Sequence, residues 1–177
     1  MWYVIQTLGG EEEHTAEIIR KRISPYYIEE CFVPKRERMK KFYGQWNKVE
    51  ETLFPAYIFV VTKRPKELYQ ELRRVPRLTK VLGREEGYFV PLSEEEEGLV
   101  RNLGGQGHRA GLSKVVVGEG KQIRVLEGPL KGYEGDVVKV NLHKREVVVR
   151  VGFMGRETKL RLGIEMVGEK VLSFNSQ

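Results

Sequence analysis

A glycine-rich segment divides the chain into two parts with different sequence patterns. Residues 104–111 read Gly-Gly-Gln-Gly-His-Arg-Ala-Gly and show no hydrophobic periodicity. Four glycines in eight residues give a backbone with little preference for helix or strand, which is typical of a connection between domains. The sequence therefore predicts two modules, over residues 1–103 and 114–170, with a flexible linker at 104–113 and a tail at 171–177.

The first module begins with alternating strand and helix patterns. Residues 2–7 read Trp-Tyr-Val-Ile-Gln-Thr, a run of aromatic and β-branched side chains that favours a strand. Apolar residues at helical spacing predict a helix over residues 11–23. Two further strands are expected over residues 30–42 and 52–62. The charged stretch between their buried parts, residues 35–51, can only be a hairpin extension or a loop.

The rest of the first module adds two helices. A short helix is expected after Pro65, followed by short strands at residues 81–82 and 88–90. Ser93 and Glu96 have the spacing of a capping box, in which each side chain bonds the backbone N–H of the other residue, and they predict a third helix. A sheet with helices packed on it indicates an α/β sandwich of about 100 residues.

The second module contains only strand patterns. Five short stretches of strand composition are separated by glycine or polar turns, which favours a small β-barrel. The expected strands cover residues 122–126, 136–142, 146–151, 157–162 and 164–167. The predicted fold class is therefore α+β, with an N-terminal α/β sandwich joined by the glycine-rich linker to a small five-stranded barrel.

The cysteine and histidine content argues against several kinds of site. Cys31 is the single cysteine, so no internal disulfide can form, and none of the three histidines has zinc-ligand spacing to it. We therefore expect no metal and no cofactor. The longest apolar runs are far shorter than the roughly 18 residues that a membrane helix needs. Since residues 1–10 also show no secretory signal, we expect a cytoplasmic monomer without a membrane partner.

Positive charge is concentrated in the second module. Residues 1–103 hold 18 lysines and arginines against 17 acidic residues, whereas residues 104–177 hold 13 against 8. The net charges are therefore +1 and +5. Clustered positive charge attracts phosphate groups, so the C-terminal part is the expected surface for a polyanion.

Catalytic patterns are not found in the sequence. The chain has no Gly-x-x-x-x-Gly-Lys-Ser/Thr phosphate loop, and its only aspartate, Asp136, lies in a predicted barrel turn. The acidic runs at residues 11–13 and 94–97 are explained by the positive ends of helix dipoles. We expect a binding protein and not an enzyme.

The glycine spacing of the second module resembles a known motif. Residues 118–140 read Gly-Glu-Gly-Lys-Gln-Ile-Arg-Val-Leu-Glu-Gly-Pro-Leu-Lys-Gly-Tyr-Glu-Gly-Asp-Val-Val-Lys-Val. Gly128, Gly132 and Gly135 fit tight connections between barrel strands, where unusual backbone angles are needed. These residues resemble the KOW motif of SH3-like barrels in transcription and ribosomal proteins, which implies binding of RNA, protein or both.

Three motifs of the first module resemble the NGN domain of the NusG family. They are Trp2-Tyr3-Val4, Phe54-Pro55-Ala56-Tyr57, and Val75-Pro76-Arg77 leading to Leu82-Gly83. The three motifs occur in this order ahead of a linker and a KOW barrel, so the resemblance extends over nearly the whole chain. The resemblance implies a transcription elongation factor that rides on bacterial RNA polymerase.

Further motifs resemble LoaP, the dedicated antiterminator branch of this family. They are Cys31-Phe32-Val33-Pro34-Lys35-Arg36-Glu37-Arg38, Pro91-Leu92-Ser93, Asn141-Leu142-His143-Lys144-Arg145 and Phe153-Met154-Gly155. Ala56 stands where the usual NusG pattern has glycine. The LoaP resemblance implies recognition of an RNA hairpin in the leader of the nascent transcript, with read-through of terminators in long operons.

The family resemblance implies that aromatic residues of the first module bind the polymerase. We expect Phe54, Tyr57 and Trp2 to present aromatic surface to the clamp helices of the β′ subunit, because aromatic anchors dominate the energetics of such interfaces. Pro55 is expected to bind there with them. Packing in the core is the alternative, for Trp2 above all.

The charged stretch at residues 35–51 contains candidate DNA-binding residues. Basic side chains can follow phosphates while aromatic rings stack on exposed bases, and the resemblance implies a position near the upstream edge of the transcription bubble. A solvated hairpin whose charges only maintain solubility is the alternative. The candidates are Lys35, Arg36, Arg38, Lys40, Lys41, Trp46 and Lys48.

The second module contains the candidate RNA-binding residues. Residues 141–146 form a polar turn between two expected strands, which places basic side chains at one rim of the barrel. Such a rim suits an RNA hairpin, through its phosphates or through splayed bases of its loop. The candidates are Lys131, Lys139, His143, Lys144, Arg145, Arg150 and Arg156.

Two other functions stay open at this point. A general NusG factor would use its barrel to bind a protein such as a ribosomal protein or Rho, and an apolar patch on the barrel would favour that function. A ribosome-associated KOW protein would act structurally on ribosomal RNA and would co-sediment with ribosomal subunits.

Overall fold

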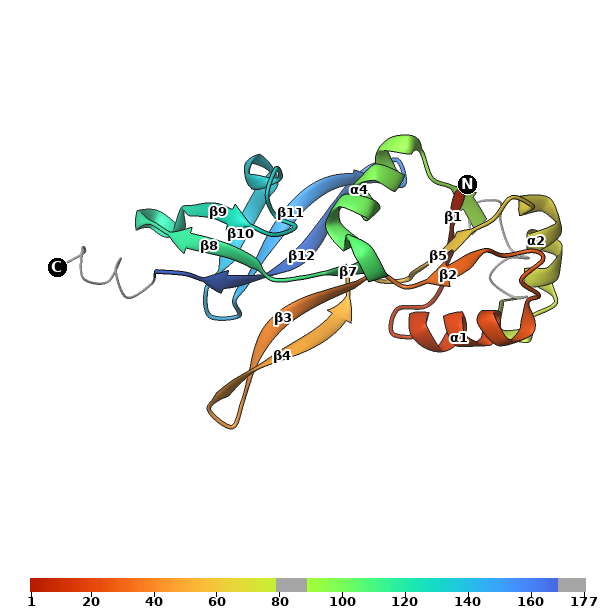
Figure 1. The fold of residues 1–177 in the computed structure, drawn as a ribbon, viewed down its shortest axis with the longest axis horizontal. Helices are drawn as coiled ribbons and strands as arrows, with labels where there is room; N and C mark the ends of the chain where they lie inside the picture. Colours follow the sequence, from red (N-terminus) through yellow and green to blue (C-terminus); the bar gives the residue numbers. More distant parts are fainter. Residues whose placement is uncertain (79–88, 169–177) are drawn as a thin grey trace. The chain divides into compact units, whose positions relative to one another are not determined.

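The computed structural model describes residues 1–78 and 89–168, which form two compact units (Figure 1). The first unit contains Met1–Pro34 and Phe54–Gly98, and the second contains Lys35–Leu53 together with the chain from Leu99 onward. The charged stretch therefore groups with the C-terminal part of the chain. The boundaries at residues 103 and 114 stay a prediction.

A four-stranded antiparallel sheet forms the centre of the first unit, in the order β2-β5-β1-β6. Strand β1 pairs with β5 along its whole length and with β6 on its other side. The sheet consists of β1 (Trp2–Gln6), β2 (Glu30–Phe32), β5 (Tyr57–Val61) and β6 (Phe89–Pro91).

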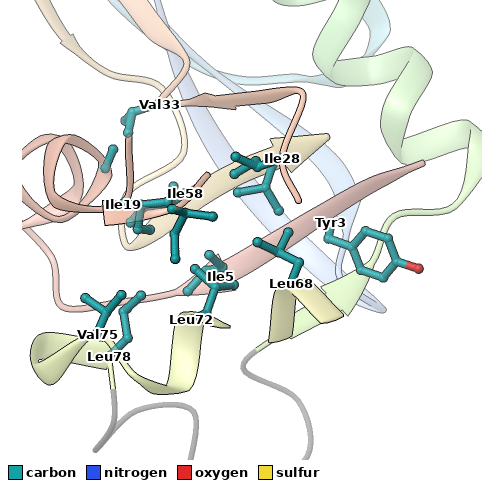
Figure 2. Close-up of a cluster of buried hydrophobic side chains, with 13 residues drawn as sticks. Tyr3, Ile5, Ile19, Ile28, Val33, Ile58, Leu68, Leu72, Val75 and Leu78 are labelled. Carbon is teal, nitrogen blue, oxygen red and sulfur yellow. The ribbon is translucent and has the colours of Figure 1, made fainter. Parts of the chain in front are cut away.

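Two helices pack against this sheet through apolar side chains (Figure 2). They are α1 (Glu12–Arg22) and α2 (Pro65–Arg73), which confirm the helices expected over residues 11–23 and after Pro65. Leu68 and Leu72, four residues apart in α2, are fully buried in the same cluster as Ile5 of β1. This spacing places both leucines on one helix face, so the helical pattern of the sequence translates directly into packing.

The prediction of one continuous strand is wrong at two places in the first module. In place of one strand over residues 30–42, β2 ends at Phe32 and β3 begins at Lys35. Pro34 lies in the break, where it cannot donate a ladder hydrogen bond. In place of one strand over residues 52–62, the chain turns between Thr52 and Tyr57. Of the other expected strands, residues 81–82 lie outside the described residues and 88–90 overlaps β6.

The third helix, α4 (Glu94–Gly104), begins with the expected capping box. The backbone N–H of Ser93 donates to Glu96 Oε1 at 3.0 Å, and the backbone N–H of Glu96 donates to Ser93 Oγ at 3.1 Å. These reciprocal bonds satisfy two backbone donors at the helix start, which confirms the sequence prediction.

The charged stretch at residues 35–51, for which the sequence allows a hairpin or a loop, forms a hairpin. Strand β3 (Lys35–Phe42) pairs with β4 (Gln45–Thr52) over eight residues. Tyr43 and Gly44 form the turn with φ of 49° and 78°. Positive φ at both positions lets a two-residue turn match the right-handed twist of the flanking strands. Strand β7 (Arg109–Ala110) pairs in parallel with the other side of β3, so part of the predicted linker is strand.

A five-stranded sheet in the order β10-β11-β12-β8-β9 completes the second unit. Val147, Val149 and Val151 are buried at alternate positions of β11, as expected for a strand with one face in a core. The five strands are β8 (Ser113–Val117), β9 (Ile123–Glu127), β10 (Val137–Asn141), β11 (Glu146–Phe153) and β12 (Arg156–Met166).

The sequence predicts the number of these strands correctly but assigns two of them wrongly. The expected strands at 157–162 and 164–167 are one strand, β12, because Gly163 stays in the ladder opposite Glu146. A Cβ at Gly163 would meet the Glu37 carbonyl oxygen and lie 2.9 Å from the Arg38 Cα. Glycine is therefore needed here for the close approach of β3 and not as a turn. Strand β8 was not predicted, since it directly follows the glycine-rich segment.

Membrane and metal sites are not found among residues 1–78 and 89–168. Within these ranges no helix is long and apolar enough to cross a membrane. The same residues contain no group of three or more histidine, cysteine, aspartate or glutamate side chains that could hold a metal ion.

The turn before β5 has an unusual backbone conformation. Ala56 has φ of +72°, in the left-handed region that L-residues with a Cβ rarely adopt. The buried carboxylate of Glu12 accepts the Ala56 N–H at 2.8 Å and the Gly10 N–H at 3.0 Å. Glu12 therefore connects the start of α1 to this turn and offsets part of the conformational cost.

We expect the substitution Ala56→Gly to stabilise the protein by roughly 0.5–1 kcal/mol. Glycine removes the cost of the left-handed conformation, about 1–2 kcal/mol, and this gain exceeds the entropy that glycine adds to the unfolded chain. Urea unfolding measures the change. Ala16→Gly, in the buried interior of α1, is the matched control and is expected to destabilise; equal destabilisation by both changes would contradict the proposed strain.

Candidate nucleic-acid interface

A cluster of buried charges joins the hairpin to the five-stranded sheet inside the second unit. Arg36 is 4% exposed and donates from Nη1 to Glu146 Oε2 at 2.9 Å and from Nη2 to Glu51 Oε2 at 2.6 Å. Arg38 Nη1 lies 3.5 Å from Glu51 and 3.7 Å from Glu146. The two carboxylates therefore neutralise two of the arginines expected to contact DNA, which face inward and not toward an open surface.

Of the other DNA candidates, all but Lys35 lie nearer the hairpin turn, and Lys40, Lys41 and Lys48 are exposed. Lys40 Nζ lies 5.3 Å from the centre of the Phe42 ring, and Lys48 pairs with Glu37 at 3.3 Å. Lys41 Nζ lies 5.8 Å from the centre of the Trp46 ring system. Lys35 is half-buried at the start of β3.

The polar turn between β10 and β11 brings three RNA candidates to the surface. Asn141 Oδ1 accepts the backbone N–H of Lys144 at 3.0 Å, which orders the turn locally. His143 and Lys144 are exposed, and Arg145 has φ of 51°. These observations fit the rim expected from the sequence.

The turn and the hairpin meet at one pair of side chains. The guanidinium carbon of Arg145 lies 4.4 Å from the centre of the Trp46 ring system, a cation–π distance. A residue expected to contact RNA and a residue expected to contact DNA thus form one surface within the second unit. The sequence did not predict this proximity, because the two residues lie far apart along the chain.

The remaining RNA candidates are spread over other parts of the sheet. Arg156 lies opposite Phe153 at the far end of the β11–β12 ladder from Glu146, about 20 Å away at the usual rise of a strand. Arg150 pairs with Glu157 at 3.7 Å, and Lys131 donates to the Leu126 carbonyl at 3.3 Å. Lys139 is exposed in β10. These residues do not form one compact site.

The aromatic residues expected to bind polymerase are only partly on the surface. Phe54 is 1% exposed and packs edge-on against Phe59, with 5.4 Å between ring centres. Trp2 is also buried, 5.2 Å from Phe32. The expectation that both present aromatic surface is therefore wrong, because the core of the first unit encloses them. Pro55 is exposed and Tyr57 is half-exposed.

The single cysteine has no reactive character. Burial raises the pKa of the Cys31 thiol to about 12, and the neighbouring Arg20 only partly opposes this effect. The thiol is therefore protonated at neutral pH and suits neither nucleophilic attack nor metal binding.

The acidic residues that organise this part of the molecule carry no local signal in the sequence. Glu146 is buried at the start of β11, directly after the exposed basic turn. A glutamate next to three basic residues is read from sequence as an exposed charge. Its burial depends on Arg36, 110 positions earlier in the chain, and no local pattern indicates that partner.

We expect Glu146→Gln to destabilise the protein by about 3 kcal/mol, because removing the buried carboxylate leaves the Arg36 and Arg38 charges with Glu51 as their one remaining carboxylate among the described residues. Urea unfolding measures the loss. Glu127→Gln is the control: Glu127 pairs with Lys114 at 3.2 Å on an exposed surface, where an ion pair contributes about 0–1 kcal/mol. Similar effects of the two changes would show that the buried cluster adds no more than a surface pair.

Comparison with protein families gives two matches. A family model described as transcription termination factor nusG matches residues 1–101, and a KOW motif model matches residues 119–151. The first match contains the three motifs of the NGN domain, and the second contains nearly all of the KOW-like stretch over residues 118–140.

Individual relatives match along nearly the whole chain. "Transcription termination/antitermination protein NusG" of Vibrio vulnificus is 30% identical over 165 residues, which is 91% of each chain. The protein of the same description from Escherichia coli is 29% identical over 170 residues, covering 94% of each chain. A solved structure described as "Domain interaction in Thermotoga maritima NusG" is similar with a TM-score of 0.57, 26% identity and 92% of each chain covered.

Proposed function

The chain belongs to the NusG family of transcription termination and antitermination factors, and we propose that it acts as a dedicated antiterminator. In this proposal the N-terminal NGN domain binds bacterial RNA polymerase at the β′ clamp helices. The KOW domain binds an RNA hairpin in the nascent leader, and the polymerase then reads through terminators of a long operon. The observation that supports this proposal is the basic turn beside Trp46 of the hairpin, where Lys144 and Arg145 form no ion pair with the described residues.

The polymerase contact is proposed for the exposed part of the Phe54–Tyr57 turn. Pro55 and Tyr57 reach the surface, while Phe54 supports them from the core. The Ala56 backbone is held by Glu12, so the turn has a defined shape. A preformed apolar surface binds with a smaller entropic cost than a mobile one, which suits a docking site.

We expect Pro55→Ala with Tyr57→Ala to reduce co-purification of the protein with RNA polymerase at least tenfold, as truncation of a hot-spot aromatic residue typically does. Both side chains are partly exposed, so the variant is expected to fold. Tyr26→Ala, which removes another exposed tyrosine of the first unit, is the matched control. Full recovery of polymerase with the double variant would contradict the docking assignment.

The RNA contact is proposed for the turn that contains His143, Lys144 and Arg145. Among the described residues, no carboxylate lies within ion-pair distance of Lys144 or Arg145, whereas Arg36 and Arg38 are neutralised by glutamates. Cations that no carboxylate neutralises are available for phosphates and bases. Binding of the nascent RNA would add to polymerase binding, because two linked contacts raise the effective concentration of the second.

We expect Lys144→Ala with Arg145→Ala to weaken RNA binding and to reduce the slope of log affinity against log salt by about one to two, since each lost phosphate contact removes about 0.7–0.9 from the slope. Affinity for hairpin RNA is measured over a series of salt concentrations. Lys114→Ala with Arg124→Ala removes the same charge from β8 and β9 and is the control. An unchanged affinity and slope would place RNA binding elsewhere.

A second function is supported by apolar side chains on the five-stranded sheet. Leu126 of β9 and Val138 of β10 are 39% and 43% exposed. Such side chains favour a protein partner, as a general NusG factor would have. That function predicts a protein contact that is lost with Leu126 and Val138 and is unaffected by changes in the basic turn.

A further inference from the structure

Trp46 of the hairpin holds the side chain of Arg145 in place. The guanidinium carbon lies over the indole, 4.4 Å from its ring centre, and Trp46 is itself half-buried. The backbone of Arg145 is fixed too, because its N–H donates to the Leu142 carbonyl at 3.3 Å and its carbonyl accepts the Ile164 N–H at 3.0 Å. Both ends of this side chain are therefore restrained before any ligand binds.

The edge of the Arg145 guanidinium group is available to a ligand. Among residues 1–78 and 89–168, no carboxylate forms an ion pair with Arg145, although Glu146, its neighbour in sequence, bonds Arg36. A guanidinium that stacks on an aromatic ring keeps its planar N–H donors directed outward. Two parallel donors of fixed geometry can bind a pair of acceptors in one plane.

The surroundings of the pair are positively charged. Lys41 Nζ lies 5.8 Å from the same ring system, and His143 and Lys144 are exposed in the adjoining turn. Lys41 and Lys144 form no ion pair with the described residues. This arrangement, with cations around one fixed planar group, suits a polyanion that also offers planar acceptors, which is the chemistry of a nucleic acid.

We propose that Trp46 is a positioning residue of the RNA site and that it orients Arg145 for bidentate recognition of an unpaired guanine. The guanine N7 and O6 atoms are the acceptor pair that an arginine fork matches best. The guanine must lie in a loop or bulge, because side chains cannot read the deep, narrow major groove of an RNA duplex. The inference rests on the proposed RNA-binding function and names the base that the site selects.

The test compares guanine with 7-deazaguanine, which lacks the N7 acceptor. The probe is an RNA hairpin with a loop of guanine and uridine, made once with natural guanine and once with 7-deazaguanine in the loop. Affinities are measured with the full chain at one salt concentration. We expect the native protein to lose about five- to tenfold in affinity with the 7-deaza loop, as for the loss of one bond of a bidentate pair.

The substitutions distinguish positioning from a general loss of charge. Trp46→Ala is expected to weaken binding of the guanine loop about five- to tenfold and to show no further loss with 7-deazaguanine. Arg145→Lys keeps the charge but not the fork, and it should behave in the same way. Trp46→Phe retains an aromatic surface and should keep most of the discrimination. Tyr43→Ala, which removes the fully exposed aromatic residue of the hairpin turn, should bind like the native protein.

Each outcome supports or overturns the inference. If Trp46→Ala discriminates between the guanine and 7-deazaguanine loops as well as the native protein does, the inference about Trp46 is overturned. The proposed RNA-binding function would stay intact. The same holds if the native protein binds both loops equally well. If the native protein binds neither RNA, the proposed RNA-binding function and the inference both fail.

Discussion

The buried contact between Arg36 and the two carboxylates of Glu51 and Glu146 is the constraint on which the second unit depends. A buried arginine is costly unless its donors are satisfied, and here both ends of the guanidinium group donate to carboxylate oxygens. Because Glu51 belongs to the hairpin and Glu146 to the five-stranded sheet, these bonds fix one element against the other. The close approach permitted at Gly163 adds a steric requirement to the electrostatic one.

The candidate RNA site follows from this constraint. Arg145 directly precedes the buried Glu146, and Trp46 lies on the same hairpin as Arg36, so the ion pairs bring the cation and the aromatic ring together. The charges thus divide into two groups with different roles. Arginines that face the carboxylates hold the unit together, and the basic residues of the turn face solvent and remain available to a ligand.

Local patterns in the sequence predict much of this fold. Helical spacing predicts α1 and α2, the Ser93–Glu96 pair predicts the start of α4, and the strand composition of residues 146–151 predicts β11. The rest depends on distant partners, which local patterns do not contain. Gly163 is of a residue type that is typical of turns, but it lies within a strand, where its missing side chain lets β3 pack against it. Phe54 is an aromatic residue of the kind that anchors interfaces, but it packs against Phe59 inside the core.

The same limit applies to the candidate site. The basic turn could be found from the sequence, since three basic residues between two strands are a local signal. Which of the neighbouring basic residues are neutralised could not be found, because no local pattern shows that Arg36 and Arg38 contact Glu51 and Glu146. Assigning a role to a charged residue therefore requires knowledge of its partners, and those of Arg36 lie 15 and 110 positions away along the chain.

The separation of Arg36 and Glu146 has a consequence for the order of folding during synthesis. The two residues are 110 positions apart, so at the usual rate of translation Arg36 is made roughly 5–20 s before its partner. A lone two-stranded hairpin is at best marginally stable in water. The hairpin, although made early, therefore reaches its final structure only after Glu146 has been made. Until then its basic strands are open to other acidic partners in the cell.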